Sequence, residues 1–321
     1  MRFLGWGVTA VVAVWGVWWW IAATAMERSV DAWFAGLRSA GWQAEAQGAS
    51  VAGFPARLDL TVTAPVLYDP LAGAGWSGPF AQVLTLAYKP WHVIAALPPD
   101  QVLTLGGTNL RLTADRLRAS VVAMPAPALP LDRTAVEGDG LRLALPPGGI
   151  AAASLRAGTR ANGGAARHDV AAVLRGVSFN LPLPPEAPAG AADLRLDATL
   201  TFDAPLDRHA GTARPALRAL TLHGAEFTWG PIAATAAGTV ESDAAGFASG
   251  RIELAVDDWP RALALAVAAG MIDPALAPTW AAIAVGLADA AGTPGRVALP
   301  LTFAGGRASL GPLPIGRAPR L

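Results

Sequence analysis

The side chains most often used for catalysis or metal binding are few and scattered in this chain. Its four histidines, His92, His168, His209 and His223, show none of the short spacings that zinc sites use. The absence of cysteine removes thiolate nucleophiles, thiolate metal ligands and disulfides. We therefore expect no metal and no cofactor, and the pattern favours a protein that is not an enzyme.

The acidic residues give no better basis for catalysis. Asp257 and Asp258 are adjacent, and neighbouring residues on a strand point to opposite faces, so they cannot form a catalytic pair there. Asp258 suits the N-cap of a following helix, and Glu137 and Asp139 flank a glycine in a turn. No nucleophile elbow or phosphate loop occurs, which disfavours nucleotide chemistry.

One short segment combines a cation with aromatic rings. In AYKPWHV, the only lysine of the chain, Lys89, stands beside Tyr88 and Trp91. This combination could recognise an anionic lipid headgroup. The alternative is a lysine that keeps a proline-containing strand edge soluble. Earlier in the chain, Phe54 of the Gly53-Phe54-Pro55 turn is expected to plug the entrance of the first strong strand.

Composition limits the class of protein. The 321 residues have a net charge of zero, no Lys/Arg cluster, 53% hydrophobic residues and 15% charged residues. Without a basic patch, nucleic-acid binding is not expected. The apolar fraction indicates a folded chain despite its many glycines and prolines.

The first segment is long enough to cross a membrane. No charged residue occurs from position 3 to position 25, and at ~1.5 Å per residue this stretch spans a ~30 Å hydrocarbon core. We predict a transmembrane anchor over residues 1–25, with a cleaved signal peptide ending near Ala23-Thr24-Ala25 as the alternative. Arg2 before the span keeps the N-terminus cytoplasmic, so the prediction is a single-pass inner-membrane protein with a periplasmic C-terminal domain.

Aromatic residues gather towards the end of this segment. Indole rings favour the boundary between lipid and water, so the cluster is predicted to lie at the membrane interface. Its members are Trp15, Trp18, Trp19 and Trp20. An amphipathic helix is predicted to follow over residues 26–42, with its apolar face at Val30, Trp33, Phe34 and Leu37 and its end at Gly41.

Beyond residue 43 the hydrophobic pattern changes to the period of two that is typical of half-buried strands. RLDLTVT from Arg57 and RLDATLT from Arg195 show it most clearly, and each precedes a Leu-Thr-Leu strand. The alternation predicts a β-rich domain over 43–321. The similarity between the two sequences has two interpretations: two repeated halves, 43–181 and 191–321, or chance convergence of strands rich in alanine, leucine and threonine. Gly305-Gly306 predicts a hairpin turn, and helices are expected from Trp259 and from Thr279.

The predicted fold class is mainly β: a transmembrane helix followed by a curved, largely antiparallel sheet, groove-like or sandwich-like, with two short helices near the C-terminus. Two short helices cannot cover so much apolar strand surface, which must therefore meet another sheet, its own other half, or lipid. The candidate lipid-binding residues are Leu58, Leu60, Val62, Leu84, Leu86, Leu196, Leu200, Phe202, Ile252 and Leu254.

Several motifs in order resemble a known family. They are GFPARLDL, WSGPF, LAYKPWHVIAALP and the closing GRASLGPLPIG, and together they are similar to the proteobacterial domain-of-unknown-function family 2125. The closing hairpin also looks similar to the ends of AsmA-like envelope proteins, whose curved sheets offer a lipid-lined groove. The resemblance implies membrane attachment and an envelope setting, and it supplies no active site.

Two functions follow as hypotheses. The first is a membrane-anchored periplasmic protein that binds or guides lipid, or another apolar envelope molecule, without catalysis. The second is an envelope structural or assembly factor that acts by protein–protein contacts and has a closed core. The expected partners are the inner membrane, lipid and other envelope proteins.

Overall fold

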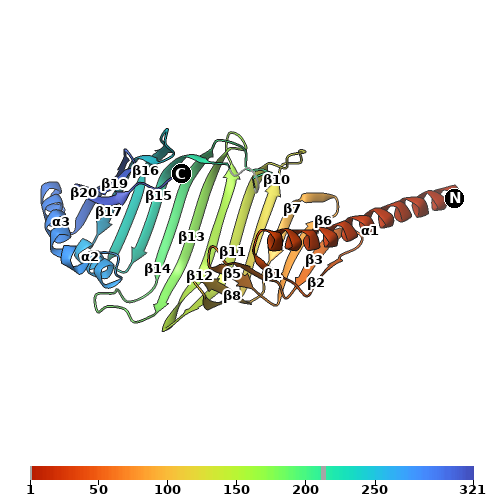
Figure 1. Ribbon diagram of the computed structural model, residues 1–321, viewed down its shortest axis with the longest axis horizontal. Helices are drawn as coiled ribbons and strands as arrows, with labels where there is room; N and C mark the ends of the chain where they lie inside the picture. Colours follow the sequence, from red (N-terminus) through yellow and green to blue (C-terminus); the bar gives the residue numbers. More distant parts are fainter. Residues whose placement is uncertain (1, 211–214) are drawn as a thin grey trace. The chain divides into compact units, whose positions relative to one another are not determined.

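Alternating strands dominate the computed structural model of this chain, which describes residues 2–210 and 215–321 (Figure 1). Strands make up 54% of the chain, and within the described residues all strand pairings are antiparallel. The chain forms two compact units. Unit 1 comprises residues 1–125 and 136–146, and unit 2 comprises residues 126–135 and 147–321. The mainly β, antiparallel prediction is confirmed.

Unit 1 contains one long helix and the first ten strands. Their bounds are α1 (Arg2–Ser39), β1 (Gln43–Glu45), β2 (Gly48–Ala52), β3 (Arg57–Thr63), β4 (Val66–Asp69), β5 (Ala74–Ser77), β6 (Phe80–Leu86), β7 (Lys89–Ala96), β8 (Asp100–Leu105), β9 (Thr108–Thr113) and β10 (Arg116–Ala123). Strand β11 (Leu131–Leu145) contributes residues to both units.

The helix α1 is continuous where the sequence suggested two segments. The predicted anchor, 1–25, and the predicted amphipathic helix, 26–42, are parts of one helix that ends at Ser39. No proline interrupts this stretch. Gly41, with a φ of 91°, lies just beyond the end in the left-handed conformation that glycine adopts without strain.

Unit 1 has two runs of paired strands, β2–β3–β6–β7–β10 and β1–β4–β5–β8–β9–β11. The chain passes from one run to the other at short breaks such as Ala64-Pro65 and Gly78-Pro79. Proline has no N–H to donate to a ladder, so strands break there. Ala64 N–H donates to Pro79 O and Gly78 N–H donates to Pro65 O, which holds neighbouring breaks together.

Unit 2 is a meander in which each strand pairs with the next one along the chain. Figure 1 shows these strands side by side from β12 to β20. Their bounds are β12 (Gly148–Ala161), β13 (Arg167–Asn180), β14 (Ala192–Phe202), β15 (Leu217–Trp229), β16 (Ile232–Ser242), β17 (Ala248–Asp257), β18 (Arg296–Ala304), β19 (Arg307–Leu310) and β20 (Leu313–Arg317). The two-residue turn at Gly305-Gly306 is confirmed, because Ala304 pairs with Arg307.

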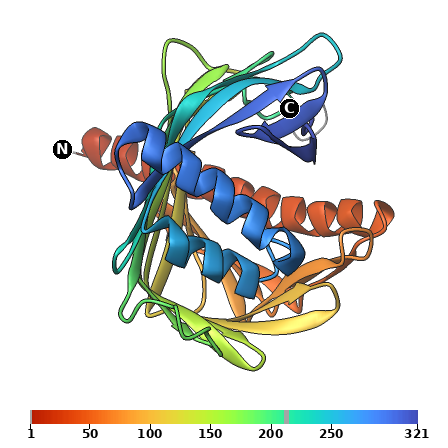
Figure 2. The same cartoon turned by 90° about the vertical axis from the view of Figure 1, so that its left-hand side faces the viewer.

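The predicted helices near the C-terminus are confirmed as α2 (Trp259–Ala268) and α3 (Ala277–Ala291), with a short 3-10 turn η1 (Pro274–Leu276) before α3. Figure 2 shows α2 and α3 next to each other in the connection between β17 and β18. The capping role predicted for Asp258 is wrong. Its backbone is left-handed, with a φ of 49°, and its side chain caps nothing but forms an ion pair with Arg261 at 3.2 Å.

The predicted halves and the compact units divide the chain at different places. Unit 2 already includes β12 and β13, and residues 182–190 form a loop between β13 and β14 inside it. The two similar sequences correspond to strand pairs, since β3 pairs with β6 and β14 pairs with β15.

Candidate functional site

The meander of unit 2 gathers apolar side chains on one face. Cross-strand partners point to the same side of a sheet, so the register decides which residues are neighbours. Leu196 lies opposite Ala172 and Ala225, and Leu254 lies opposite Ala236 and Leu299. The same row extends across β13 to β18 and forms a continuous apolar surface, here called the unit 2 apolar face.

All five candidates predicted in this half lie on that face. Leu200 pairs with Leu220, and Ile252 pairs with Leu301. The Phe202 ring meets the ring of buried His168, the cross-strand partner of Leu200, with centroids 6.5 Å apart. The structure therefore brings together Leu196, Leu200, Phe202, Ile252 and Leu254.

These side chains are only half-buried. Helix α2 contributes no buried residue, and α3 buries Ala284 and Ala288 alone. Among the described elements, α2 and α3 make close backbone contact with two of the strands, β16 and β18. The opposite face carries polar partners such as Thr199 and Thr221. Unit 2 thus has a polar face and an apolar face, and its helices make close contact with only part of the sheet.

The candidates of unit 1 are divided between two faces. Leu58, Leu60 and Val62 are buried beneath α1, where Phe34 of the helix is 4% exposed. Leu84 pairs with Asp59, and Leu86 pairs with Arg57, so both leucines lie on the other side of the sheet. Unit 1 uses its helix-facing leucines as core.

A groove remains between α1 and the strands of unit 1. Its volume is about 420 Å³, and every residue that lines it is apolar. The helix supplies Val30, Trp33 and Phe34, and Trp33 is 53% exposed. The strands and their breaks supply Leu60, Val62, Pro65, Leu67, Trp76, Ala81, Val83 and Leu97. Sequence reasoning found the helix residues from their 3.6-residue period but missed Trp76 and Leu97, because no local pattern relates them to α1.

The tryptophans of α1 have two different environments. Trp15 Nε1–H donates to Pro55 O at 2.8 Å, and Trp19 Nε1–H donates to Arg57 O at 2.7 Å. Trp18 and Trp20 are 43% and 65% exposed. Phe54 does not plug the strand entrance as predicted. It is 54% exposed and packs edge-on against Trp19, with centroids 5.5 Å apart.

The candidate headgroup residues lie at the start of β7. Tyr88 is 63% exposed in the turn between β6 and β7, and Lys89 and Trp91 are half-buried behind it. Lys89 pairs with Leu86, so this end of β7 is bonded to β6. Among the described residues, no ion pair of Lys89 is present.

One polar cluster lies on the polar face of unit 2. Thr199 Oγ1 is 2.8 Å from both Asp169 Oδ1 and His223 Nε2, and Asn162 Nδ2–H donates to Asp169. Hydrogen bonds from Asn162 and Thr199 hold the pKa of Asp169 below its ordinary value. The hydroxyl lies between the acid and the imidazole, whereas a nucleophilic triad needs the imidazole in the middle. No group of three potential metal ligands occurs within the described residues.

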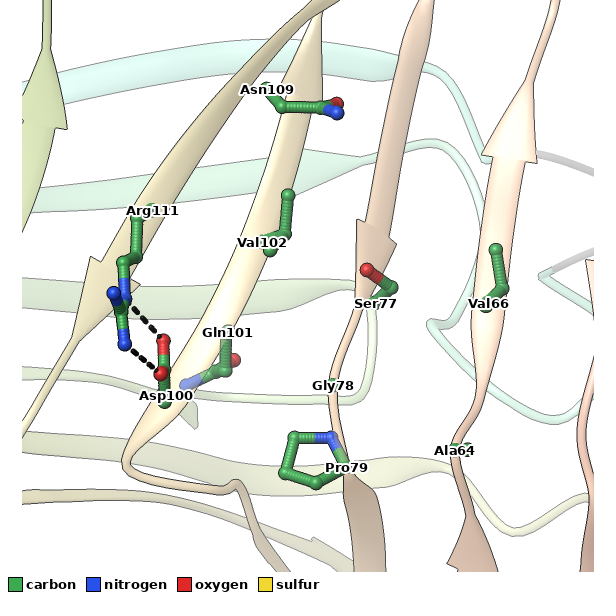
Figure 3. Close-up of a pocket in the computed structure, with 10 residues that line it drawn as sticks. All are labelled: Ala64, Val66, Ser77, Gly78, Pro79, Asp100, Gln101, Val102, Asn109 and Arg111. Atoms are coloured by element: carbon green, nitrogen blue, oxygen red, sulfur yellow. Dashed lines mark hydrogen bonds and ion pairs between the residues drawn. The ribbon is translucent and has the colours of Figure 1, made fainter.

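A second polar cluster lines a pocket of unit 1 that has a volume of about 640 Å³ (Figure 3). Asp100 and Arg111 pair on its wall, and Arg111 Nε–H donates to Asp100 Oδ1 at 2.9 Å. The hydrogen bond from Arg111 lowers the pKa of Asp100. The pair neutralises its own charge and offers neither a free base nor a free acid. Neither polar cluster has the arrangement of a known catalytic site.

Two helices among the described residues are long and apolar enough to cross a membrane, within 10–39 and 274–291. The second includes α3, which packs on β18 and buries Ala284 and Ala288. The N-terminal helix is compatible with either a membrane anchor or a signal sequence.

Comparison with known proteins gives one match. No curated protein and no solved structure matches this chain, and nothing supports the likeness to AsmA-like proteins. A family profile matches residues 19–319, which is nearly the whole chain and includes every motif that suggested the resemblance. The chain therefore belongs to DUF2125, a family described as uncharacterized protein conserved in bacteria.

Proposed function

We propose that this protein is a membrane-anchored periplasmic protein that binds or guides lipid, or another apolar envelope molecule, on the unit 2 apolar face. The observation that carries the proposal is the continuous row of apolar side chains from β13 to β18, in which Leu196, Leu200 and Leu254 are only half-buried. Exposed apolar surface on this scale usually marks a binding surface. Its strands expose leucine, isoleucine, valine and alanine, which suit an acyl chain better than a polar ligand.

The binding would be non-covalent. Each Å² of apolar surface removed from water contributes about 25 cal/mol, so a chain lying across several strands gains affinity in small, similar increments. A surface of this kind holds a ligand without fixing its position along the row. Sliding and exchange are then easier than in a closed pocket. No catalytic step is part of the proposal.

Location supports the same function. The exposed apolar helix α1 would hold the chain at the inner membrane, with the N-terminus in the cytoplasm and both units in the periplasm. A tethered protein stays close to the molecules of the bilayer. The competing function is an envelope assembly factor whose apolar face is covered by another protein.

Site-specific crosslinking distinguishes these functions. A photoreactive phenylalanine analogue replaces Leu200 in the full-length protein in cells, and the control places it at Thr201 on the opposite face of β14. We expect crosslinks to lipid from position 200 and none from position 201. Mass spectrometry of the adducts identifies the partner. Crosslinks from position 200 to protein alone would support the assembly factor.

A charge substitution tests whether the surface is open. For this test the photoreactive analogue replaces Leu254. Leu200→Asp should then abolish lipid crosslinking from position 254, because a charge disfavours an acyl chain on this face. The protein should stay folded, because the side chain at position 200 is only half-buried. Thr201→Asp adds the same charge to the other face and should leave the crosslinking unchanged. If Leu200→Asp unfolds unit 2, as judged by circular dichroism, the face is a sealed core and the proposal fails.

A further inference from the structure

One end of unit 1 exposes aromatic side chains on two neighbouring turns. Phe54, in the turn between β2 and β3, is 54% exposed, and Tyr88, in the turn between β6 and β7, is 63% exposed. Ala87 N–H donates to Ala56 O at 2.9 Å, which ties the two turns together. This pair of turns, 53–56 and 87–88, is here called the aromatic tip.

The aromatic tip is fixed to the side of α1. The indoles of Trp15 and Trp19 donate to Pro55 O and Arg57 O, and the Phe54 ring packs against Trp19. These contacts set the level of the tip along the helix at residues 15–19. The same indoles satisfy two carbonyl groups that would be costly to leave unpaired in an apolar environment.

Helix length then places the tip relative to a bilayer. The stretch of α1 before Trp15 is about 20 Å long at 1.5 Å per residue, whereas the hydrocarbon core is about 30 Å thick. A full span needs about 20 apolar residues and therefore continues beyond Trp19. The tip lies beside the last part of that span and would meet the membrane together with it.

Charge agrees with this placement. Phe54 and Tyr88 lie in the turns, whereas the ion pair between Arg57 and Asp59 at 2.8 Å belongs to β3 and Lys89 is the first residue of β7. Glu27, the first acid of α1, is also beyond the tip and accepts from Val51 N–H at 2.9 Å. Aromatic rings at the turns, with charged groups on the adjoining strands, match the change from acyl chains to headgroups across a leaflet.

From these contacts we infer that the aromatic tip of unit 1 inserts into the outer leaflet of the bilayer that α1 crosses, with Lys89 at headgroup level. The occupant of this surface is a lipid bilayer, recognised by apolar rings and a nearby cation. The inference rests on the membrane attachment contained in the proposed function, but it does not depend on the unit 2 apolar face.

The same unit supplies a control that is also exposed and apolar. Leu71, in the turn between β4 and β5, is 96% exposed. Strand β4 pairs with β1, which follows the C-terminal end of α1. Residues 19 and 39 of α1 are about 30 Å apart along the helix axis. Leu71 should therefore stay in water while the tip contacts lipid.

The absence of cysteine makes the test direct, since any introduced cysteine is the only one. Phe54→Cys, Tyr88→Cys and Leu71→Cys variants of the full-length protein are labelled with an environment-sensitive fluorophore. Each is reconstituted into vesicles of phosphatidylcholine and phosphatidylglycerol that carry a nitroxide on the upper acyl chain. Vesicle flotation measures attachment, and nitroxide quenching measures contact with acyl chains.

We expect all three variants to float, with quenching and a blue shift at positions 54 and 88 and neither at position 71. Equal quenching at the three positions, or none at 54 and 88 in floating protein, overturns the inference and leaves the membrane anchor intact. Failure to float overturns the anchor and the inference together. Circular dichroism compares folding, and Tyr88→Cys leaves the contact between Phe54 and Trp19 in place.

Lys89→Gln tests whether Lys89 contacts the lipid headgroups. In labelled Tyr88→Cys protein, this substitution should reduce quenching in vesicles with phosphatidylglycerol and change nothing in phosphatidylcholine alone. The same loss in both lipids would assign Lys89 a structural role and remove the headgroup contact from the inference.

Discussion

Strands with the same alternation are used differently in the two units. In unit 1 the apolar side of β3 is covered by α1, and Leu60 is 5% exposed. In unit 2 Leu200 of β14 is only half-buried, and the close backbone contacts of α2 and α3 are with β16 and β18. A period of two therefore shows that a strand has an apolar face, but not what covers that face. The covering element decides between core and binding surface.

The sharpest test of this comparison is a pair of equal truncations. Leu60→Ala should lower the free energy of unfolding by about 2 to 5 kcal/mol, since it empties a packed site beneath α1. Leu200→Ala should cost about 1 kcal/mol, because its side chain is only half-buried. Urea unfolding of the full-length protein in detergent measures both. Equal losses would mean that both faces are closed cores.

The stability of unit 2 should depend more on its backbone conformation than on its half-buried leucines. Gly238 has a φ of 154°, and a Cβ there would lie 2.2 Å from Arg251 O. We expect Gly238→Ala to destabilise unit 2 by about 1 to 3 kcal/mol through strain. Gly224→Ala, on the neighbouring strand with open space around it, is the matched control. Similar melting temperatures for the two variants would contradict this explanation.

The packing of α1 on β3 in unit 1 also depends on a hydrogen bond. Trp19→Phe keeps an aromatic ring but leaves Arg57 O without its donor, and should cost about 1 kcal/mol. Hydrogen exchange in β3 should speed up, because α1 holds that end of the strand less firmly. Trp20→Phe changes an indole that is 65% exposed and should leave the exchange unchanged. If hydrogen exchange in β3 rises equally in both variants, loss of the hydrogen bond from Trp19 to Arg57 O is not the cause.

The smallest expected effect concerns the polar face of unit 2. Thr199→Val removes a hydrogen bond to Asp169, so the pKa of that carboxyl group should rise towards its ordinary value. A lowered pKa stabilises the fold at pH values above the pKa of the unfolded chain, and this stability is lost as the pH falls through the folded pKa. The variant should therefore be slightly less stable at neutral pH and equal to the parent in strong acid. NMR titration of the side-chain carboxyl group measures the shift.

Local patterns were enough to predict much of the fold. The period of two located β3, β14 and β17, and Gly305-Gly306 fixed the last hairpin, because register and turn chemistry are local properties. Proline placed the starts of α2 and α3 to within a few residues. The continuity of α1 was missed, because a change from apolar to charged residues resembles the end of a helix even where the backbone continues.

The candidate sites could be predicted only in part. The five residues of unit 2 share a face because a meander keeps sequence neighbours paired. Leu84 and Leu86 could not be separated from Leu58 and Leu60, because the pairing of β3 with β6 crosses two intervening strands. The bonds of Trp15 and Trp19 to the turn near Pro55 join positions about 40 residues apart, and no short motif specifies them.

The meander of unit 2 also has a kinetic consequence. Because each strand pairs with the one made just before it, nearly all its contacts join segments close in sequence, and closing each loop costs little entropy. A chain that emerges with its N-terminal side first can add one hairpin at a time to a growing edge. Each edge strand would then wait only for the next segment to arrive. Such a sheet can assemble while the chain is still emerging, which limits the time its apolar face spends without ordered neighbours.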